Sequence, residues 1–176
     1  MGKIYTALGL MTGTSMDGLD ASIIKSDGIR EYSIKIDKYF EYSDELRKKL
    51  INIRSKVSFA EDLKVHSDEI KSLEKEITLF HANAVNKIIE TSKIEVDLLG
   101  FHGQTIFHDG EKKITKQLGD GNMLSKLTKK IVVYNFRQND LENDGQGAPL
   151  TPIYHNLLAQ TFIEKGKIKL PIIILN

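Results

Sequence analysis

The chain has 176 residues and a formal net charge of +1, so its charge gives no argument for nucleic acid as a partner. It contains no cysteine, which excludes a disulfide framework or a thiolate zinc site and is typical of a protein in a reducing cytosol. No apolar run approaches the roughly 20 residues that span a bilayer, and no signal peptide precedes the first strand, so we expect a soluble, cytoplasmic α/β domain without a membrane partner.

The start of the chain predicts three strands joined by hairpins, over residues 4–11, 19–25 and 32–39. The turn between the first two strands consists of small hydroxyl residues, two glycines and two carboxylates. Glycine there permits a close backbone approach that a Cβ would block. Because an apolar strand resumes after the turn and no Walker lysine follows, we interpret it as the tip of a hairpin rather than a strand-to-helix P-loop.

This turn carries groups that suit a phosphate. Thr14 and Ser15 offer hydroxyl and amide donors for phosphate oxygens, and Asp17 and Asp20 can hold a hydrated magnesium ion beside them. The residues alone leave a second interpretation equally open, namely a tight turn whose hydroxyls are satisfied locally.

Two helices are expected next. Ser43 can cap a helix that runs through residues 46–53, and apolar residues at alternating spacings of three and four predict one long helix from Leu63 to Ile88. His66 and His81 lie on or beside the apolar stripe of the long helix, and we interpret both as structural.

The second half of the chain alternates strands with helices and polar loops. In order, we expect a buried strand at 96–101, a polar loop at 102–105, a short helix at 121–130, a buried strand at 131–136, a polar loop at 137–149, a helix at 151–165 begun by Pro152, and a strand at 168–175. Three antiparallel strands followed by this alternation predict an α/β fold with a mixed sheet of the ribonuclease H-like type and flanking helices.

Polar loops that follow the strands of such a sheet meet at one edge and form a cleft. His102 and Gln104 can hydrogen-bond sugar hydroxyls or carbonyls there, although His102 has the alternative role of satisfying backbone groups at its strand end. Arg137 and Asp140 can pair with each other, or Arg137 can reach a carboxylate or phosphate of a ligand. Asp140 is a candidate general base by position alone, and residues 145–149 are small enough to let the backbone approach a ligand.

Four segments resemble, in the same order, segments of the anhydro-N-acetylmuramic acid kinase family: GLMTGTSMDGLD, GFHGQTIFH, QLGDGN and VVYNFRQNDLENDGQGAPLTPIYH. The resemblance implies the actin-like sugar kinase fold, in which two ribonuclease H-like lobes hold ATP and sugar between them. It further implies transfer of the ATP γ-phosphate, with Mg2+, to 1,6-anhydro-N-acetylmuramic acid, coupled to hydrolytic opening of the anhydro ring. The product would be N-acetylmuramic acid 6-phosphate, formed in cell-wall recycling.

The resemblance assigns roles to two groups of positions. The ATP phosphate loop comprises Gly13, Thr14, Ser15, Met16, Asp17, Gly18, Leu19 and Asp20. The sugar-facing positions are His102, Gln104, Thr105, Arg137, Asp140 and Gln146. The metal would be held through water by Asp17 and Asp20. Three positions depart from the family's usual pattern: Asn135 stands where Asp is general, Glu142 where a small residue is common, and Asp144 where Gly is common.

Asn176 corresponds to the first residue of the family's NIGGIAN-type segment, and the GFDxGPGN-type segment with the general-base aspartate follows later in the family. We therefore expect residues 1–176 to form a single N-terminal kinase lobe, to contain no catalytic base and to be inactive alone. A separately encoded C-terminal lobe is the partner that would complete the site. The alternative is a non-catalytic remnant or a weak sugar- or nucleotide-binding module.

Overall fold

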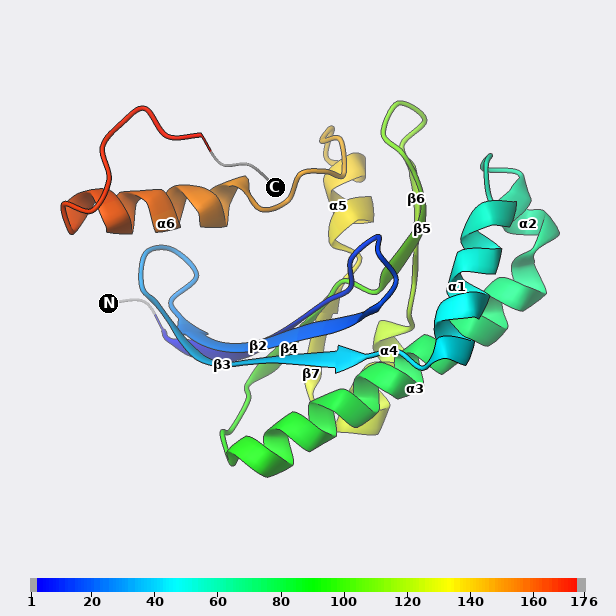
Figure 1. Ribbon diagram of the computed structural model, residues 1–176, viewed down its shortest axis with the longest axis horizontal. Coiled ribbons are helices and arrows are strands. Elements are labelled where there is room, and N and C mark those ends of the chain that lie inside the picture. Colours follow the sequence, from blue (N-terminus) through cyan, green and yellow to red (C-terminus); the bar gives the residue numbers. More distant parts are fainter. Residues whose placement is uncertain (1–2, 174–176) are drawn as a thin grey trace.

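The computed structural model describes residues 3–173 and contains a five-stranded mixed sheet with helices on both sides (Figure 1). The strand order is β3-β2-β1-β4-β7, and a separate two-stranded sheet pairs β5 with β6. The elements are β1 Tyr5–Met11, β2 Gly18–Ser26, β3 Tyr32–Glu41, α1 Asp44–Lys56, α2 Asp62–Val65, α3 Ser67–Ser92, β4 Leu98–Phe101, β5 Gln104–Asp109, β6 Ile114–Leu118, α4 Gly121–Thr128, β7 Ile131–Tyr134, α5 Phe136–Glu142 and α6 Pro152–Glu164. The predicted fold class, a ribonuclease H-like lobe with three antiparallel N-terminal strands, is confirmed.

The central strand β1 pairs antiparallel with β2 and parallel with β4, which in turn pairs parallel with β7. Its side chains alternate, so that Leu8 and Leu10 are buried on one face while Tyr5 and Met11 are exposed. Because β1, β4 and β7 run in the same direction, their carboxyl ends meet at one edge of the sheet. The polar segments that follow them are therefore brought together.

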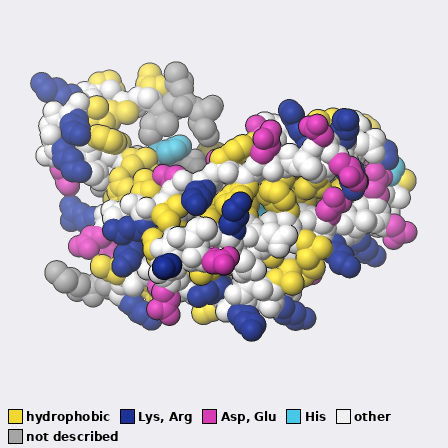
Figure 2. All heavy atoms as spheres, turned by 60° about the horizontal axis from the view of Figure 1, so that its bottom comes forward, with side chains coloured by type: hydrophobic (Ala, Val, Ile, Leu, Met, Phe, Trp, Pro, Cys, Tyr) yellow, Lys and Arg dark blue, Asp and Glu magenta, His cyan; other side chains and the backbone are white. Residues whose placement is uncertain are grey.

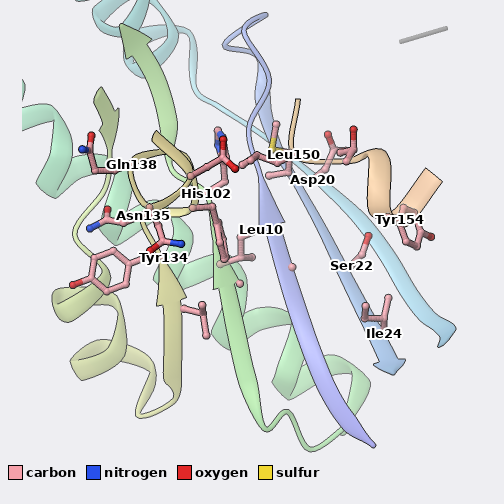
Figure 3. A pocket seen from close by; sticks show the side chains of 18 of the residues that line it. Leu10, Asp20, Ser22, Ile24, His102, Tyr134, Asn135, Gln138, Leu150 and Tyr154 are labelled. Carbon is pink, nitrogen blue, oxygen red and sulfur yellow. The ribbon is translucent and has the colours of Figure 1, made fainter. Parts of the chain in front are cut away.

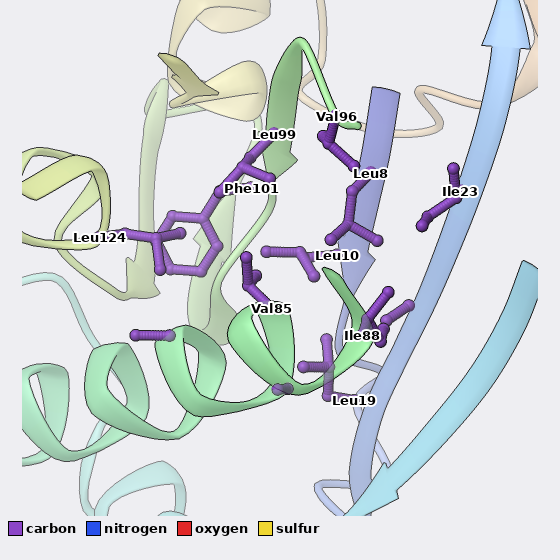
Figure 4. Close-up of a cluster of buried hydrophobic side chains, with 13 residues drawn as sticks. Leu8, Leu10, Leu19, Ile23, Val85, Ile88, Val96, Leu99, Phe101 and Leu124 are labelled. Carbon is purple, nitrogen blue, oxygen red and sulfur yellow. The ribbon is translucent and has the colours of Figure 1, made fainter. Parts of the chain in front are cut away.

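The buried face of the sheet packs on α3 through a cluster of apolar side chains (Figure 4). Leu10 of β1 and Phe101 of β4 lie in this cluster together with Val85 and Ile88 of α3. Burying one such side chain contributes about 1.5–3 kcal/mol relative to leaving it exposed. This cluster holds the sheet on α3 and fixes the ends of its strands.

A second apolar cluster joins α1, the first half of α3 and the β5–β6 hairpin. Leu50 of α1, Ile77 of α3 and Ile106 of β5 are fully buried in it. Met16, from the turn between β1 and β2, belongs to the same cluster. The predicted phosphate turn is therefore anchored in a hydrophobic core.

The helix predictions for the first half are confirmed with one correction. The Ser43 side chain caps α1 by accepting a hydrogen bond from Leu46 N at 3.2 Å. The single helix predicted from Leu63 to Ile88 is wrong, because His66, at φ −101° and ψ 22°, separates α2 from α3. The apolar stripe continues across this break, so the periodicity did not reveal it.

Two loop predictions are corrected. The loop predicted at 102–105 is shorter, because β5 begins at Gln104 and pairs with β6, where Ile106 and Phe107 become buried in the second cluster. The loop predicted at 137–149 begins instead with α5, whose side chain Leu141 is fully buried. In both segments, tertiary burial of a few apolar residues outweighs a polar local composition.

Two strand predictions are also corrected. The strand predicted as buried at 131–136 is an exposed sheet edge that ends at Tyr134. Among residues 3–173, β7 pairs with β4 alone, and Ile131 and Val133 are 68% and 44% exposed. The strand predicted at 168–175 is not formed by residues 168–173, and its last residues lie outside the described part of the chain. This segment follows α6, which contacts β3 at the opposite edge from β7, and Pro171 has no amide to donate to a ladder.

Basic and acidic side chains are interspersed on the face of the molecule shown in Figure 2. Two ion pairs, Lys49–Glu76 at 3.2 Å and Lys56–Glu69 at 2.9 Å, join α1 to α3. All four side chains are partly exposed, so water screens these pairs and they add little stability. Among residues 3–173, no helix is long and apolar enough to cross a membrane.

Candidate functional site

A cavity of about 1370 Å3 lies on the face of the sheet opposite α3 (Figure 3). Its floor consists of positions that alternate with the core residues, such as Gly9 of β1, Ser22 of β2 and Gly100 of β4. One wall is α5, and the segment that leads into α6 closes another side. Of the positions predicted to bind ligands, the cavity brings together Asp20, His102 and Asp140.

The turn between β1 and β2 adjoins this cavity, since Met11 before it and Asp20 after it both belong to the lining. Thr14 and Ser15 are exposed in the turn. The Ser15 hydroxyl donates a hydrogen bond to Asp17 Oδ1 at 2.6 Å, and this bond lowers the pKa of Asp17. The carboxylate of Asp17 is therefore charged at neutral pH.

Other predicted positions of the turn are fixed by burial. Met16 is 3% exposed, and its backbone N–H donates to Gly13 O at 3.3 Å. Leu19 is fully buried in the first cluster. A Cβ on Gly18 would overlap the ring of Tyr39 and a backbone oxygen of β3, so only glycine fits there. The side chains left for a ligand are those of the hydroxyl and carboxylate residues.

Tyr39, on β3 beside the turn, was missed by the sequence analysis. Partial burial, together with the negative charges of Asp17, Glu41 and Asp20, raises the pKa of Tyr39. Asp20 is the cross-strand partner of Tyr39, and Asp17 lies in the turn that precedes β2. Among residues 3–173, no group of three or more ligating side chains gathers around one point. Two carboxylates plus water fit Mg2+, which keeps several of its waters. The register could have revealed Tyr39, which is the cross-strand partner of Asp20.

His102 follows β4 and is held between two neighbours. Its Nδ1–H donates to Gly103 O at 2.6 Å, and its Nε2 accepts from Arg137 Nε at 2.8 Å. Burial lowers the pKa of His102, and the charge of Arg137 acts in the same direction. The ring is therefore neutral, with its proton on Nδ1. These contacts are those of the alternative role foreseen for His102, which also lines the cavity.

In the part of the chain that the structure describes, Arg137 and Asp140 form no ion pair with each other, and both hold Gly147. Arg137 Nη1 donates to Gly147 O at 2.7 Å, and Gly147 N donates to Asp140 Oδ2 at 2.8 Å. Gly147 has φ 69°, and a Cβ there would lie 2.8 Å from a ring carbon of His108. The glycine loop at 145–147 is thus clamped by two side chains of α5.

The remaining predicted sugar-facing residues lie beside the cavity rather than in its lining, as far as residues 3–173 show. Gln104 is fully buried, and its Nε2 donates to Gly13 O at 2.9 Å. Thr105 Oγ1 accepts from Gln117 Nε2 at 3.3 Å. Gln146 is exposed and lies against the turn between β5 and β6. These residues support neighbouring loops.

The sequence analysis also missed polar side chains of the cavity that α5 presents. Asn135, at φ 61°, precedes the helix, and Gln138 and Asn139 follow on the same side, all three in the lining. They were missed because Asn135 was expected at the end of a buried strand, and Gln138 and Asn139 in a loop. Their spacing of three and four residues is the signal that indicates a helix face.

Comparison with known proteins agrees with the resemblance seen in the motifs. The sequence profile of the family described as "Anhydro-N-acetylmuramic acid kinase" matches residues 5–169. Curated relatives with the same name come from Pelagibacter ubique (56% identical over 100% of this chain and 46% of that protein) and Rhizobium etli (39% over 95% and 46%). A third, from Gluconobacter oxydans, is 42% identical over 86% of this chain and 42% of that protein. The chain thus spans about half the length of the curated relatives it matches. The profile match and these identities show that the chain belongs to the anhydro-N-acetylmuramic acid kinase family.

Proposed function

We propose that this chain forms the phosphate- and sugar-facing lobe of a kinase that phosphorylates 1,6-anhydro-N-acetylmuramic acid with ring opening. The observation that carries the proposal is the meeting of Asp20, His102 and Asp140 in one cavity beside the turn at 12–17. These residues come from three segments that are far apart in the sequence. Phosphoryl transfer depends on holding phosphate and acceptor side by side, and a turn with phosphate donors next to a polar cavity suits that task.

The turn supplies the ATP end of the site. The exposed Thr14 hydroxyl and the backbone amides of Thr14 and Ser15 are donors for phosphate oxygens, whereas the Ser15 hydroxyl donates to Asp17. Asp17, whose pKa is lowered by Ser15, would hold Mg2+ through water together with Asp20. When bound, ATP supplies the phosphoryl group, and Mg2+ neutralises part of its charge.

The end of β4 and α5 supply the sugar end of the site. Sugar hydroxyls and an acetamide group need both donors and acceptors, and the side-chain amides of Asn135, Gln138 and Asn139 offer both. Tyr154 and Val133 add apolar surface that can pack on a sugar ring. Arg137 and His102 would act mainly by holding the surrounding backbone in place.

We further propose that residues 1–176 act as one lobe in the cytoplasm, where ATP is available, and that a second polypeptide completes the site. By resemblance, the general-base aspartate belongs to the GFDxGPGN-type segment, which is not in these residues. Asp140 is a poor substitute, since its Oδ2 already accepts a hydrogen bond from Gly147 N. A second lobe would align the attacking water with the sugar and the phosphoryl group.

A coupled assay of ADP release tests the proposal. The chain is mixed with the C-terminal half of the Pelagibacter ubique relative, 1,6-anhydro-N-acetylmuramic acid, ATP and Mg2+. We expect turnover from the mixture and none from either polypeptide alone. Asp17→Asn should lower kcat/KM by about tenfold or more, whereas Asp68→Asn, in the first turn of α3, is the matched control that should leave it unchanged.

Two outcomes would contradict parts of the proposal. Turnover by the 176-residue chain alone would show that the second lobe is not needed. No turnover from the mixture, combined with no binding of ATP or anhydro sugar to this chain in calorimetry, would favour a non-catalytic remnant.

A further inference from the structure

Two side-chain hydrogen bonds, one buried and one partly buried, hold the turn at 12–17 on the residues that follow β4. Thr12 Oγ1 donates to Gly103 O at 2.8 Å, and Gln104 Nε2 donates to Gly13 O at 2.9 Å. Thr12 is 2% exposed and Gln104 is fully buried. Because a buried polar group that loses its partner is costly, these bonds fix the direction of the two carbonyl groups.

The same hydrogen-bonded chain continues to the far side of the site. Gly103 O, which accepts from Thr12, also accepts from His102 Nδ1–H at 2.6 Å. His102 Nε2 accepts from Arg137 Nε, and Arg137 Nη1 donates to Gly147 O. The contacts are therefore continuous from the turn, through the end of β4 and α5, to the glycine loop.

We infer that His102 is a positioning residue that couples the turn at 12–17 to the glycine loop at 145–147. Its ring donates through one nitrogen and accepts through the other, so it fixes the Gly103 carbonyl on one side and the Arg137 guanidinium on the other. Movement of the turn or of the glycine loop changes the hydrogen bonding of this ring and thereby alters the position of the other segment. The inference depends on the proposed function only for the meaning of the two ends, which would be the phosphate and sugar sides of the site.

The first test is the tautomer of His102 in the unmodified chain. Nitrogen-15 NMR of the histidine rings at neutral pH should show Nδ1 protonated and Nε2 unprotonated. A ring with its proton on Nε2, or a doubly protonated ring, could not accept from Arg137 and would overturn the inference. This measurement needs no variant and no ligand.

The second test is hydrogen exchange of the Met16 amide, which donates to Gly13 O inside the turn. Arg137→Met removes the far end of the chain of contacts and should raise the exchange rate of this amide by about tenfold. The matched control is Arg54→Met, because Arg54 also donates to a backbone carbonyl, that of Val57, but outside the chain of contacts. Exchange of the Ile88 amide, in the core helix α3, serves as the reference for global unfolding.

The third test separates the two nitrogens of His102. In His102→Gln the side-chain oxygen can reach the position of Nε2 and accept from Arg137, but nothing at the position of Nδ1 donates to Gly103 O. The Met16 amide should therefore exchange about as fast as in Arg137→Met, and protection as in the unmodified chain would overturn the inference. Equal exchange of Met16 in Arg137→Met and Arg54→Met would overturn the inference. If the Ile88 amide exchanges faster in every variant, the variants unfold globally more often. The His102 tautomer measured in the unmodified chain then decides whether the inference stands. A failed kinase assay leaves all these readouts valid, so the two proposals fail separately.

Discussion

Lys113 Nζ lies 2.6 Å from Asp144 Oδ1, so an ion pair ties the turn between β5 and β6 to the loop after α5. Both residues have left-handed backbones, with φ 54° at Lys113 and 65° at Asp144. The hydrogen bond and the charge of Lys113 lower the pKa of Asp144. Both side chains are well exposed, so water screens the pair. Asp144 thus keeps a partner at a position where the family commonly has glycine, but its backbone strain remains.

Replacing Asp144 by glycine should stabilise the chain. A left-handed conformation costs a residue with a Cβ about 1 kcal/mol, and glycine avoids this cost. We expect Asp144→Gly to raise the free energy of unfolding by about that amount in urea titrations. Asp144→Ala, which loses the ion pair and keeps the Cβ, is the control and should lower it. Equal effects of the two substitutions would show that the backbone angle is not responsible.

Met16 should matter for stability although it lies in a turn. Its side chain is 3% exposed and belongs to the second apolar cluster. Met16→Ala would leave a cavity there and should lower the free energy of unfolding by about 3 kcal/mol. Met11→Ala, at a site that is 45% exposed on β1, is the matched control and should cost much less. Similar losses at both positions would rule out the anchoring role of Met16.

The parts of the fold that could be predicted from the sequence are those specified by local patterns. The first three strands follow from alternation and turn residues, and α1 follows from its Ser43 cap. The β5–β6 hairpin could not be predicted in this way, because its register shifts between Thr105 and Phe107. Ile106 and Phe107 are both buried, which breaks the alternation that identifies a strand.

The contacts of the candidate site, too, could be predicted only as far as local sequence patterns specify them. The sequence places Arg137 and Asp140 three residues apart, which leaves two expectations open: that they pair, or that Arg137 reaches an anionic group of a ligand. In the structure both instead hold Gly147, which the chain reaches only after a loop with a positive φ at its end. The path of that loop depends on contacts with α5 and with His108, which no local pattern encodes.

Gly145 should be intolerant of any side chain. A Cβ there would overlap the carboxylate of Asp140, which accepts from Gly147 N. Gly145→Ala should therefore break this hydrogen bond and lower the free energy of unfolding by about 1–3 kcal/mol. Gly9→Ala is the control, because the nearest atom to its Cβ would be Ser22 O at 3.9 Å. The double variant Gly145→Ala/Asp140→Ala should be less destabilised than the sum of the single variants, and full additivity would contradict the argument.

The free energy of unfolding should decrease as the pH is lowered, because His81 is buried in its neutral form. This residue of α3 is fully buried, its Nδ1–H donates to Ile77 O at 2.8 Å, and its ring packs edge-on against Phe101. Burial lowers the pKa of His81 from 6.5 to about 4. The unfolded chain therefore binds this proton more tightly than the folded chain does. The resulting stability is present above pH 6.5 and is lost as the pH falls from 6.5 towards 4, by about 3 kcal/mol in total. Urea titrations across this range measure the loss, to which burial of His102 adds a part that His102→Gln removes. In His81→Phe the slope between these pH values should become shallower, and an unchanged slope would mean that His81 does not titrate with folding.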